Sequence, residues 1–186
     1  MGLLFGSHRR ELTLEGVGVR PRSARAKSVR RADSHASDVK WACLRLRADL
    51  VSTTPLDVFR ERDGLLFEVD KPPVLKSPDG KIDVTEWLYS TQFDLDDVGN
   101  TFGLIKQKTA LGYPSIIELV PVESVTVRVK DGHVSYQFGS EIIPSEMVWH
   151  ERQFTTSGSP MGLSPTAHAA LTLSGYLNAA EFAADW

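Results

Sequence analysis

An apolar repeat at helical spacing indicates the first folded segment, which begins near Ser37 and ends before Pro55. Five apolar residues recur at intervals of three and four positions, namely Val39, Ala42, Cys43, Leu46 and Leu50. Residues three and four apart lie on one face of an α-helix, so this repeat predicts an amphipathic helix that docks its apolar face, with Cys43 as a buried thiol, onto a sheet. Ser37 is a suitable N-cap, and Pro55 ends the helix.

Alternating apolar and polar positions predict a β-hairpin directly after this helix. The segments "PLDVFRE" (55–61) and "LLFEV" (65–69) flank Asp63-Gly64, a pair that suits the positive φ angles of a tight turn. A second helix is predicted over 85–98, with Asp83 or Thr85 as its cap and Gly99-Asn100 at its end.

Strands and one further helix fill the rest of the chain. Strands are predicted at 101–109, 115–122, 125–130 and 133–138, with an edge strand at 146–152 and a short strand within 11–19. Ser164-Pro165 marks the start of a last helix that runs to the end of the chain with a wide apolar surface. The order of elements predicts an α+β fold with three helices and small antiparallel or mixed sheets.

Charge divides the chain into a basic arm and an acidic remainder. Residues 1–40 hold nine basic and four acidic residues, whereas the remainder holds twelve and twenty. We predict a flexible arm over 1–35, an α+β domain over 36–163 and a helix over 164–186. Six basic residues of the arm are candidate contacts for nucleic acid or an acidic partner, the alternative being a solvated tail: Arg20, Arg22, Arg25, Lys27, Arg30 and Arg31.

No motif in the sequence points to catalysis, a metal or a cofactor. The chain lacks a G-x-x-x-x-G-K-[ST] phosphate loop and a G-x-S-x-G elbow, and its five histidines lack ligand spacing. The acids Asp94, Asp96 and Asp97 are interpreted as a solvated helix face. The single cysteine fits a reducing compartment, and no signal peptide or membrane-length apolar run is present, so a soluble intracellular protein is expected.

Four segments, in this order, resemble the N-terminal part of portal proteins of tailed phages with long non-contractile tails. They are "VKWACLRLRADLVSTTPLDVFRE" (39–61), "VTEWLYSTQFDLDDVGNTFGLIKQ" (84–107), "GYPSIIELVPVESVTVRVKDGHVSYQF" (112–138) and "VWHERQFTTSGSPMGLSPTAHAA" (148–170). Two departures stand out. The polar "DLDD" (94–97) replaces a usually apolar stretch, and Glu123-Ser124 departs from a Pro-rich version.

The resemblance implies a structural protein without an active site. Residues 36–163 correspond to the outer wing of a portal, and the last helix leads towards a stem that the chain does not contain. The family forms rings of twelve subunits at one capsid vertex of the virion, after assembly in the host cytoplasm. Its partners are capsid and scaffold proteins, the terminase, the head-tail adaptor and the double-stranded DNA that passes through.

Aromatic and aliphatic residues are the candidates for packing between subunits. They are Trp41, Leu173, Tyr176, Leu177 and Trp186. Two other classes of protein stay open from the residues alone. One is a small α+β enzyme with an unrecognised site, and the other is a nucleic-acid-binding module that uses the basic arm.

Overall fold

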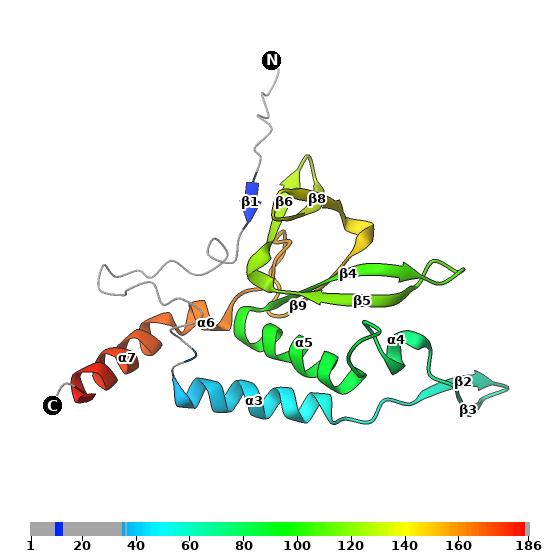
Figure 1. Ribbon diagram of the computed structural model, residues 1–186, viewed down its shortest axis with the longest axis horizontal. Helices are drawn as coiled ribbons and strands as arrows, with labels where there is room; N and C mark the ends of the chain where they lie inside the picture. Colours follow the sequence, from blue (N-terminus) through cyan, green and yellow to red (C-terminus); the bar gives the residue numbers. More distant parts are fainter. Residues whose placement is uncertain (1–9, 13–34, 36, 185–186) are drawn as a thin grey trace, which may run out of the picture.

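The computed structural model describes residues 10–12, 35 and 37–184 as an α+β fold, in which every strand pair is antiparallel (Figure 1). The described helices are α3 (Asp38–Ser52), α4 (Pro73–Lys76), α5 (Val84–Val98), α6 (Pro165–His168) and α7 (Ala170–Ala184), with 3₁₀ turns at Val122–Ser124 and Ser145–Met147. The α+β class is therefore confirmed.

Three small sheets make up the strand part of the described residues. The first orders β5 (Pro114–Val120), β4 (Asn100–Lys108) and β9 (Val148–Arg152). The second orders β1 (Arg10–Leu12), β6 (Val125–Lys130), β7 (His133–Phe138) and β8 (Glu141–Pro144). The third is the hairpin of β2 (Val58–Arg62) and β3 (Leu65–Val69). The predicted edge strand is β9, which lies at one edge of the first sheet.

The core lies between the first two sheets and the loop that follows β9. Phe102, Val122, Val127 and Met161 are fully buried there. Helix α5 is attached to the first sheet, since the indole Nε1 of Trp87 donates a hydrogen bond to Ile117 O at 3.2 Å. The first sheet and α5 support α3 and α6, both of which contact α5.

Local capping sets the helix boundaries, as the sequence predicts. The Ser37 side chain accepts a hydrogen bond from Lys40 N, and Asp83 accepts one from Glu86 N. Gly99 ends α5 in the left-handed region at φ +73°. A Cβ at this position would lie 2.1 Å from the backbone oxygen of Leu163, so only glycine fits both the angle and the space.

Three parts of the prediction needed correction. The short helix α4 and the strand β8 were not predicted. The last helix is not continuous, because α6 ends at His168 and α7 begins at Ala170.

The largest error concerns the face of α3 that is buried. Val39, Leu46 and Leu50 of the predicted apolar stripe are 67%, 61% and 62% exposed, and Cys43 is exposed as well. The buried residues of α3 are instead Leu44, Ala48 and Ser52. Helix α3 packs beside α5 and not on a sheet (Figure 1). The reason is the acidic pair at the end of α5, described next.

Candidate docking surface

A buried carboxylate joins the three helical elements at one end of the molecule. Asp97 of α5 has a fully buried side chain. Its Oδ1 lies 2.6 Å from Lys40 Nζ of α3 and accepts a hydrogen bond at 2.5 Å from Thr166 Oγ1 of α6, while its Oδ2 lies 2.8 Å from His35 Nε2. The interpretation of this acidic stretch as a solvated face is therefore wrong for both Asp96 and Asp97, which are buried.

A second ion pair holds α3 about two helical turns further along. Arg47 Nε lies 2.8 Å from Asp96 Oδ2, which also accepts a hydrogen bond from Gln92 Nε2 at 2.9 Å. The hydrogen bond and charge of Asp96 raise the pKa of Arg47. Asp96 is buried whereas Arg47 is 58% exposed, so this pair contributes less to stability than the buried pair of Asp97. Together the two pairs explain why the cationic face of α3 turns inward.

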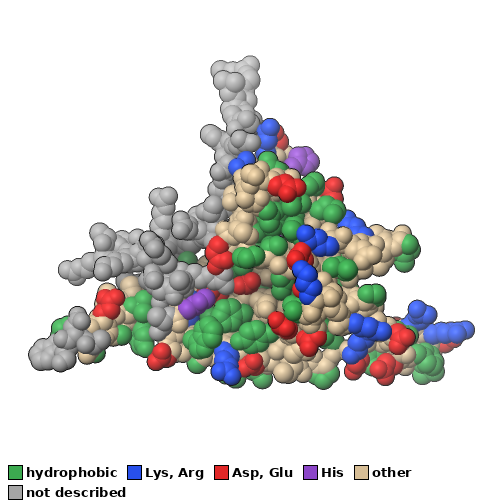
Figure 2. Space-filling model, viewed as in Figure 1, with side chains coloured by type: hydrophobic (Ala, Val, Ile, Leu, Met, Phe, Trp, Pro, Cys, Tyr) green, Lys and Arg blue, Asp and Glu red, His purple; other side chains and the backbone are tan. Residues whose placement is uncertain are grey.

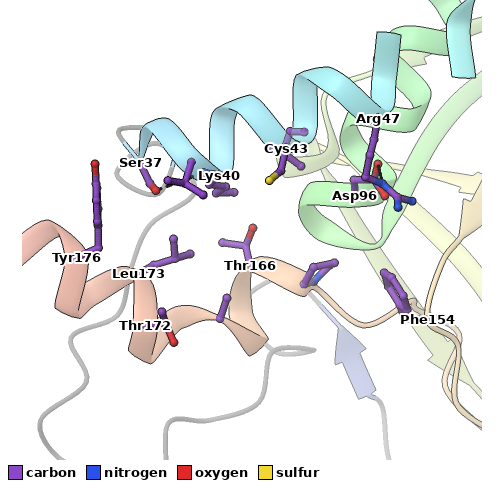
Figure 3. A pocket seen from close by; sticks show the side chains of 14 residues that line it. Ser37, Lys40, Cys43, Arg47, Asp96, Phe154, Thr166, Thr172, Leu173 and Tyr176 are labelled. Carbon is purple, nitrogen blue, oxygen red and sulfur yellow. Dashed lines mark hydrogen bonds and ion pairs between the residues drawn. The ribbon is translucent and has the colours of Figure 1, made fainter. Parts of the chain in front are cut away.

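An apolar groove lies between α3 and the helices α6 and α7. Its volume is about 560 Å³, and Figure 3 shows the side chains of both walls pointing towards the space between them. The α3 wall includes Val39, Cys43 and Leu44, and the opposite wall includes Pro165, Leu173 and Tyr176. We call this the α3–α7 groove. Val39 and Cys43 also belong to the exposed apolar stripe of α3, so groove and stripe form one continuous surface.

The predicted packing residues divide between this groove and other places. Leu173 and Tyr176 both line the groove, Leu173 being buried and Tyr176 exposed. Leu177 is half-buried and is not among the lining residues. Trp41 is 45% exposed and makes an edge contact with Phe93 of α5, with ring centroids 5.6 Å apart. Trp186 lies outside the described residues.

The six basic residues of the N-terminal arm also lie outside the described residues. They are Arg20, Arg22, Arg25, Lys27, Arg30 and Arg31. Their contact with nucleic acid or an acidic partner stays a prediction. Of the arm, the structure describes His35, which contacts Asp97, and Arg10–Leu12, which form β1 and pair with β6.

A polar network that the sequence did not reveal lies in the strand part. His150 stacks on Phe102 with ring centroids 4.2 Å apart, and its two ring nitrogens lie 3.1 Å from Tyr136 OH and 3.2 Å from Asn100 Oδ1. Burial, and secondarily the charge of Arg152, lower the pKa of His150 to about 4, so the ring is neutral at pH 7. This network ties β4, β7 and β9 together.

Asn100 extends the network to the loop after β9. Its Oδ1 accepts a hydrogen bond from Gly162 N at 2.7 Å, and its Nδ2 donates to the carbonyls of Val98 and Gly162. All partners of the Asn100 side chain are backbone atoms or the His150 ring. The network therefore has a structural role.

No group of three or more His, Cys, Asp or Glu side chains among the residues described could hold a metal ion. None of the described helices has the length and apolar character that crossing a bilayer requires. The most prominent features of this part of the chain are surfaces suited to contact with another protein segment.

Comparisons with known proteins identify the class to which this fold belongs. A family model described as phage portal protein matches residues 38–186. The chain therefore belongs to the phage portal protein family. A search of curated proteins gave no match.

Solved structures of similar fold include portal and neck proteins. The chain is similar to an HK97 family phage portal protein from Corynebacterium diphtheriae, with 17% identity, a TM-score of 0.61 and coverage of 84% of this chain and 49% of that one. It is also similar to a chain in the neck of an empty gene transfer agent particle, with 17% identity, a TM-score of 0.68 and coverage of 90% and 48%. The chain thus spans about half the length of these proteins.

Proposed function

We propose that the chain is a structural subunit of a phage portal, the head-tail connector ring through which DNA is packaged and ejected. The observation that carries this proposal is the match of the portal family over residues 38–186. One of the similar structures is a gene transfer agent neck computed with twelvefold symmetry, which is the arrangement expected here. The subunit has no catalytic role in the proposal, and a separate terminase moves the DNA.

The proposed division of labour follows the parts of the chain. Residues 36–163 act as the wing, and residues 164–186 form a helix that continues towards the portal core. The basic arm over 1–35 contacts DNA or acidic partners. The subunit works at the portal vertex of the virion after assembly in the host cytoplasm, with capsid, scaffold and head-tail adaptor proteins as neighbours.

The docking surface supports an assembly role. The α3–α7 groove and the exposed stripe of α3 place Val39, Leu46, Leu50 and Tyr176 in solvent. Continuous exposed apolar surface is typical of a site that another protein covers. In a portal ring the neighbouring subunits are the first candidates for that role.

Ring formation is the test of the proposed function. We expect the intact, full-length gene product to form closed particles with rotational symmetry in negative-stain electron microscopy, with a mass of several subunits by light scattering. A full-length protein that stays monomeric at high concentration would contradict the proposal. Open chains of subunits without closure would also contradict it.

A further inference from the structure

Two hairpins project at the same end of the molecule, and both expose apolar side chains. They are the β2–β3 hairpin and the far end of the β4–β5 hairpin, residues 106–113, which we call the β4–β5 tip (Figure 1). Phe59, Leu66, Leu111 and Tyr113 are between 55% and 83% exposed. Figure 2 shows hydrophobic surface at both places, at the right of the view. Apolar side chains exposed so far from the core are typical of contact with another protein.

The two faces of the β2–β3 hairpin carry opposite charge, because residues paired across the strands share a face. One face, which we call the acidic face, holds two cross-strand pairs: Phe59 with Glu68, and Glu61 with Leu66. Arg60 and Arg62 lie on the other face. Within the described part of the chain, neither Glu61 nor Glu68 forms an ion pair, so the acidic face keeps two negative charges that its own chain leaves unpaired.

The β4–β5 tip carries positive charge. Its charged residues are Lys106 and Lys108. Lys108 Nζ donates a hydrogen bond to the backbone oxygen of Glu146 at 2.9 Å, a neutral partner that leaves the charge in place. Lys106 Nζ lies 3.1 Å from one carboxylate oxygen of Glu118, but the other oxygen lies 2.8 Å from Lys81 Nζ, so two lysines share one negative charge. The tip therefore keeps a net positive charge beside its exposed apolar side chains.

The acidic face and the β4–β5 tip match in charge, in apolar character and in spacing. Each carries two charged residues and two exposed apolar ones. Glu61 and Glu68 are diagonal neighbours across the two strands, about 7 Å apart. Lys106 and Lys108 are two positions apart in one strand, a separation of about 7 Å as well. Two Lys–Glu pairs can therefore form next to each other while the apolar side chains are buried between them.

Like charges disfavour the other ways in which two copies could meet at these places. The acidic face against itself would bring carboxylates together, and the tip against itself would bring lysines together. The tip against the other face of the hairpin would place its lysines beside Arg60 and Arg62. The remaining combination joins two different surfaces of the chain. Such a contact is head-to-tail, and its repetition closes into a ring when the rotation allows it.

We propose that the β4–β5 tip of one copy docks on the acidic face of the β2–β3 hairpin of a second copy, with Lys106 and Lys108 paired to Glu61 and Glu68. This inference rests on the proposed function, because it assigns one contact between neighbouring subunits of the ring. Both hairpins project at the same end of each copy, so copies standing side by side bring one tip to the next hairpin (Figure 1). Two patches of this size bury less than the about 1,200 Å² of a stable interface, so the contact adds to others in the ring.

Carbodiimide cross-linking of the full-length gene product tests this contact directly. The reagent joins a lysine amine to a carboxylate without a spacer, so it links only groups that touch. Unlabelled protein and protein labelled with heavy nitrogen are mixed before assembly and cross-linked as rings. We expect peptides that join Glu61 or Glu68 to Lys106 or Lys108, with one light and one heavy partner. Rings that give no such peptides, or give them only with both partners of one label, would overturn the proposal.

The matched control for this experiment keeps the charge and removes the amine. A protein with Lys106→Arg and Lys108→Arg should assemble like the wild type, because arginine also pairs with carboxylates. The same protein should lose the cross-linked peptides of the tip. Persistence of peptides assigned to these positions would show that the assignment is false and overturn the proposal.

Charge reversal tests the energetic role of the contact. Glu61→Lys with Glu68→Lys makes the acidic face basic, and Lys106→Glu with Lys108→Glu makes the tip acidic. All four positions are exposed, so circular dichroism should show unchanged folding. Each double variant should raise the concentration at which half of the protein is assembled by about tenfold or more in analytical ultracentrifugation, since two attractive pairs become repulsive. The protein with all four reversals should return close to the wild-type value.

Arg60→Glu with Arg62→Glu is the matched control on the other face of the same hairpin. It changes as many charges as the reversal of the acidic face, yet the proposed contact does not involve it, so assembly should be unchanged. An equal loss of assembly in this control would overturn the proposal. A protein with all four reversals that assembles no better than either double variant would also overturn it.

The failure of this inference and of the proposed function can be told apart. Rings that form without the links between the tip and the acidic face would remove this contact and leave the portal assignment intact. Linked chains of subunits that never close would support the contact and contradict the ring. A full-length wild-type protein that is monomeric throughout would overturn both.

Discussion

Replacement of Asp97 by asparagine removes the negative charge from the carboxylate that joins α3, α5 and α6. Lys40 Nζ lies 2.6 Å from Asp97 Oδ1, and the Lys40 side chain is only 9% exposed. The substitution keeps the size of the side chain but takes this counter-charge from a buried ammonium group. Loss of one partner of a buried ion pair destabilises proteins by about 3–5 kcal/mol. We expect Asp97→Asn to lower the free energy of unfolding by about that amount.

Asp96→Asn is the matched control on the neighbouring residue. Its partner Arg47 is largely exposed, so the expected loss is about 1 kcal/mol or less. Urea unfolding followed by tryptophan fluorescence gives both values, and for a chain of this size about 3–5 kcal/mol corresponds to a fall in melting temperature of about 6–20 °C. A second variant, Lys40→Met with Asp97→Leu, should recover most of the stability, since apolar replacement of a whole buried pair is often neutral. A loss no larger for Asp97→Asn than for Asp96→Asn would refute the reasoning.

Two further predictions concern the His150 network and the end of α5. His150 has a folded-state pKa of about 4 against an ordinary value of 6.5, so the unfolded state gains a proton first, and stability should fall by about 3 kcal/mol as pH drops from above 6.5 to 4. The His150→Asn variant should lack this component in urea titrations at pH 7 and pH 4, and an unchanged pH dependence would contradict the assignment. Gly99→Ala should lower stability by well over the about 1–2 kcal/mol of a left-handed backbone alone, because its Cβ would meet the Leu163 carbonyl. Gly112→Ala, at φ +84° with open space around it, measures the backbone effect by itself in thermal unfolding, and equal losses for the two variants would be evidence against the steric explanation.

Element boundaries could be predicted because they depend on neighbours in sequence. Asp83 caps α5 through Glu86 N, three residues away, and Ser164 caps α6 through Ala167 N. The turn at Asp63-Gly64 has φ angles of +53° and +76°, as its residue types favour. Caps and turns between residues so close in sequence can be predicted without knowledge of the tertiary structure.

The buried face of α3 could not be predicted from its apolar pattern. The pattern shows that a helix has two different faces, but it does not show which face its own chain covers. Here the decision depends on Lys40 and Asp97, which lie far apart in sequence. A usable signal existed, since Lys40 and Arg47 are seven positions apart on one face of α3, and Asp96-Asp97 offers two adjacent acids.

The docking surface was only partly accessible to sequence reasoning. Leu173 and Tyr176, which were predicted to pack between subunits, both line the groove, and their contact with a neighbouring subunit stays a prediction. Cys43 was assigned to the buried core of its own chain, although it lies exposed on the groove wall. An apolar helix stripe has the same sequence pattern whether the same chain or a different chain covers it.

The ion pairs of Lys40 and Arg47 also affect the thermodynamics of association. Two attachments about two turns apart fix both the rotation of α3 and its position along its axis. The apolar stripe is therefore held in one orientation before any partner arrives. A surface ordered in advance loses little conformational entropy when it binds, so more of the energy gained by burying its apolar side chains contributes to affinity. In this protein, the two ion pairs that attach α3 to α5 keep the exposed apolar stripe of α3 rigid for assembly.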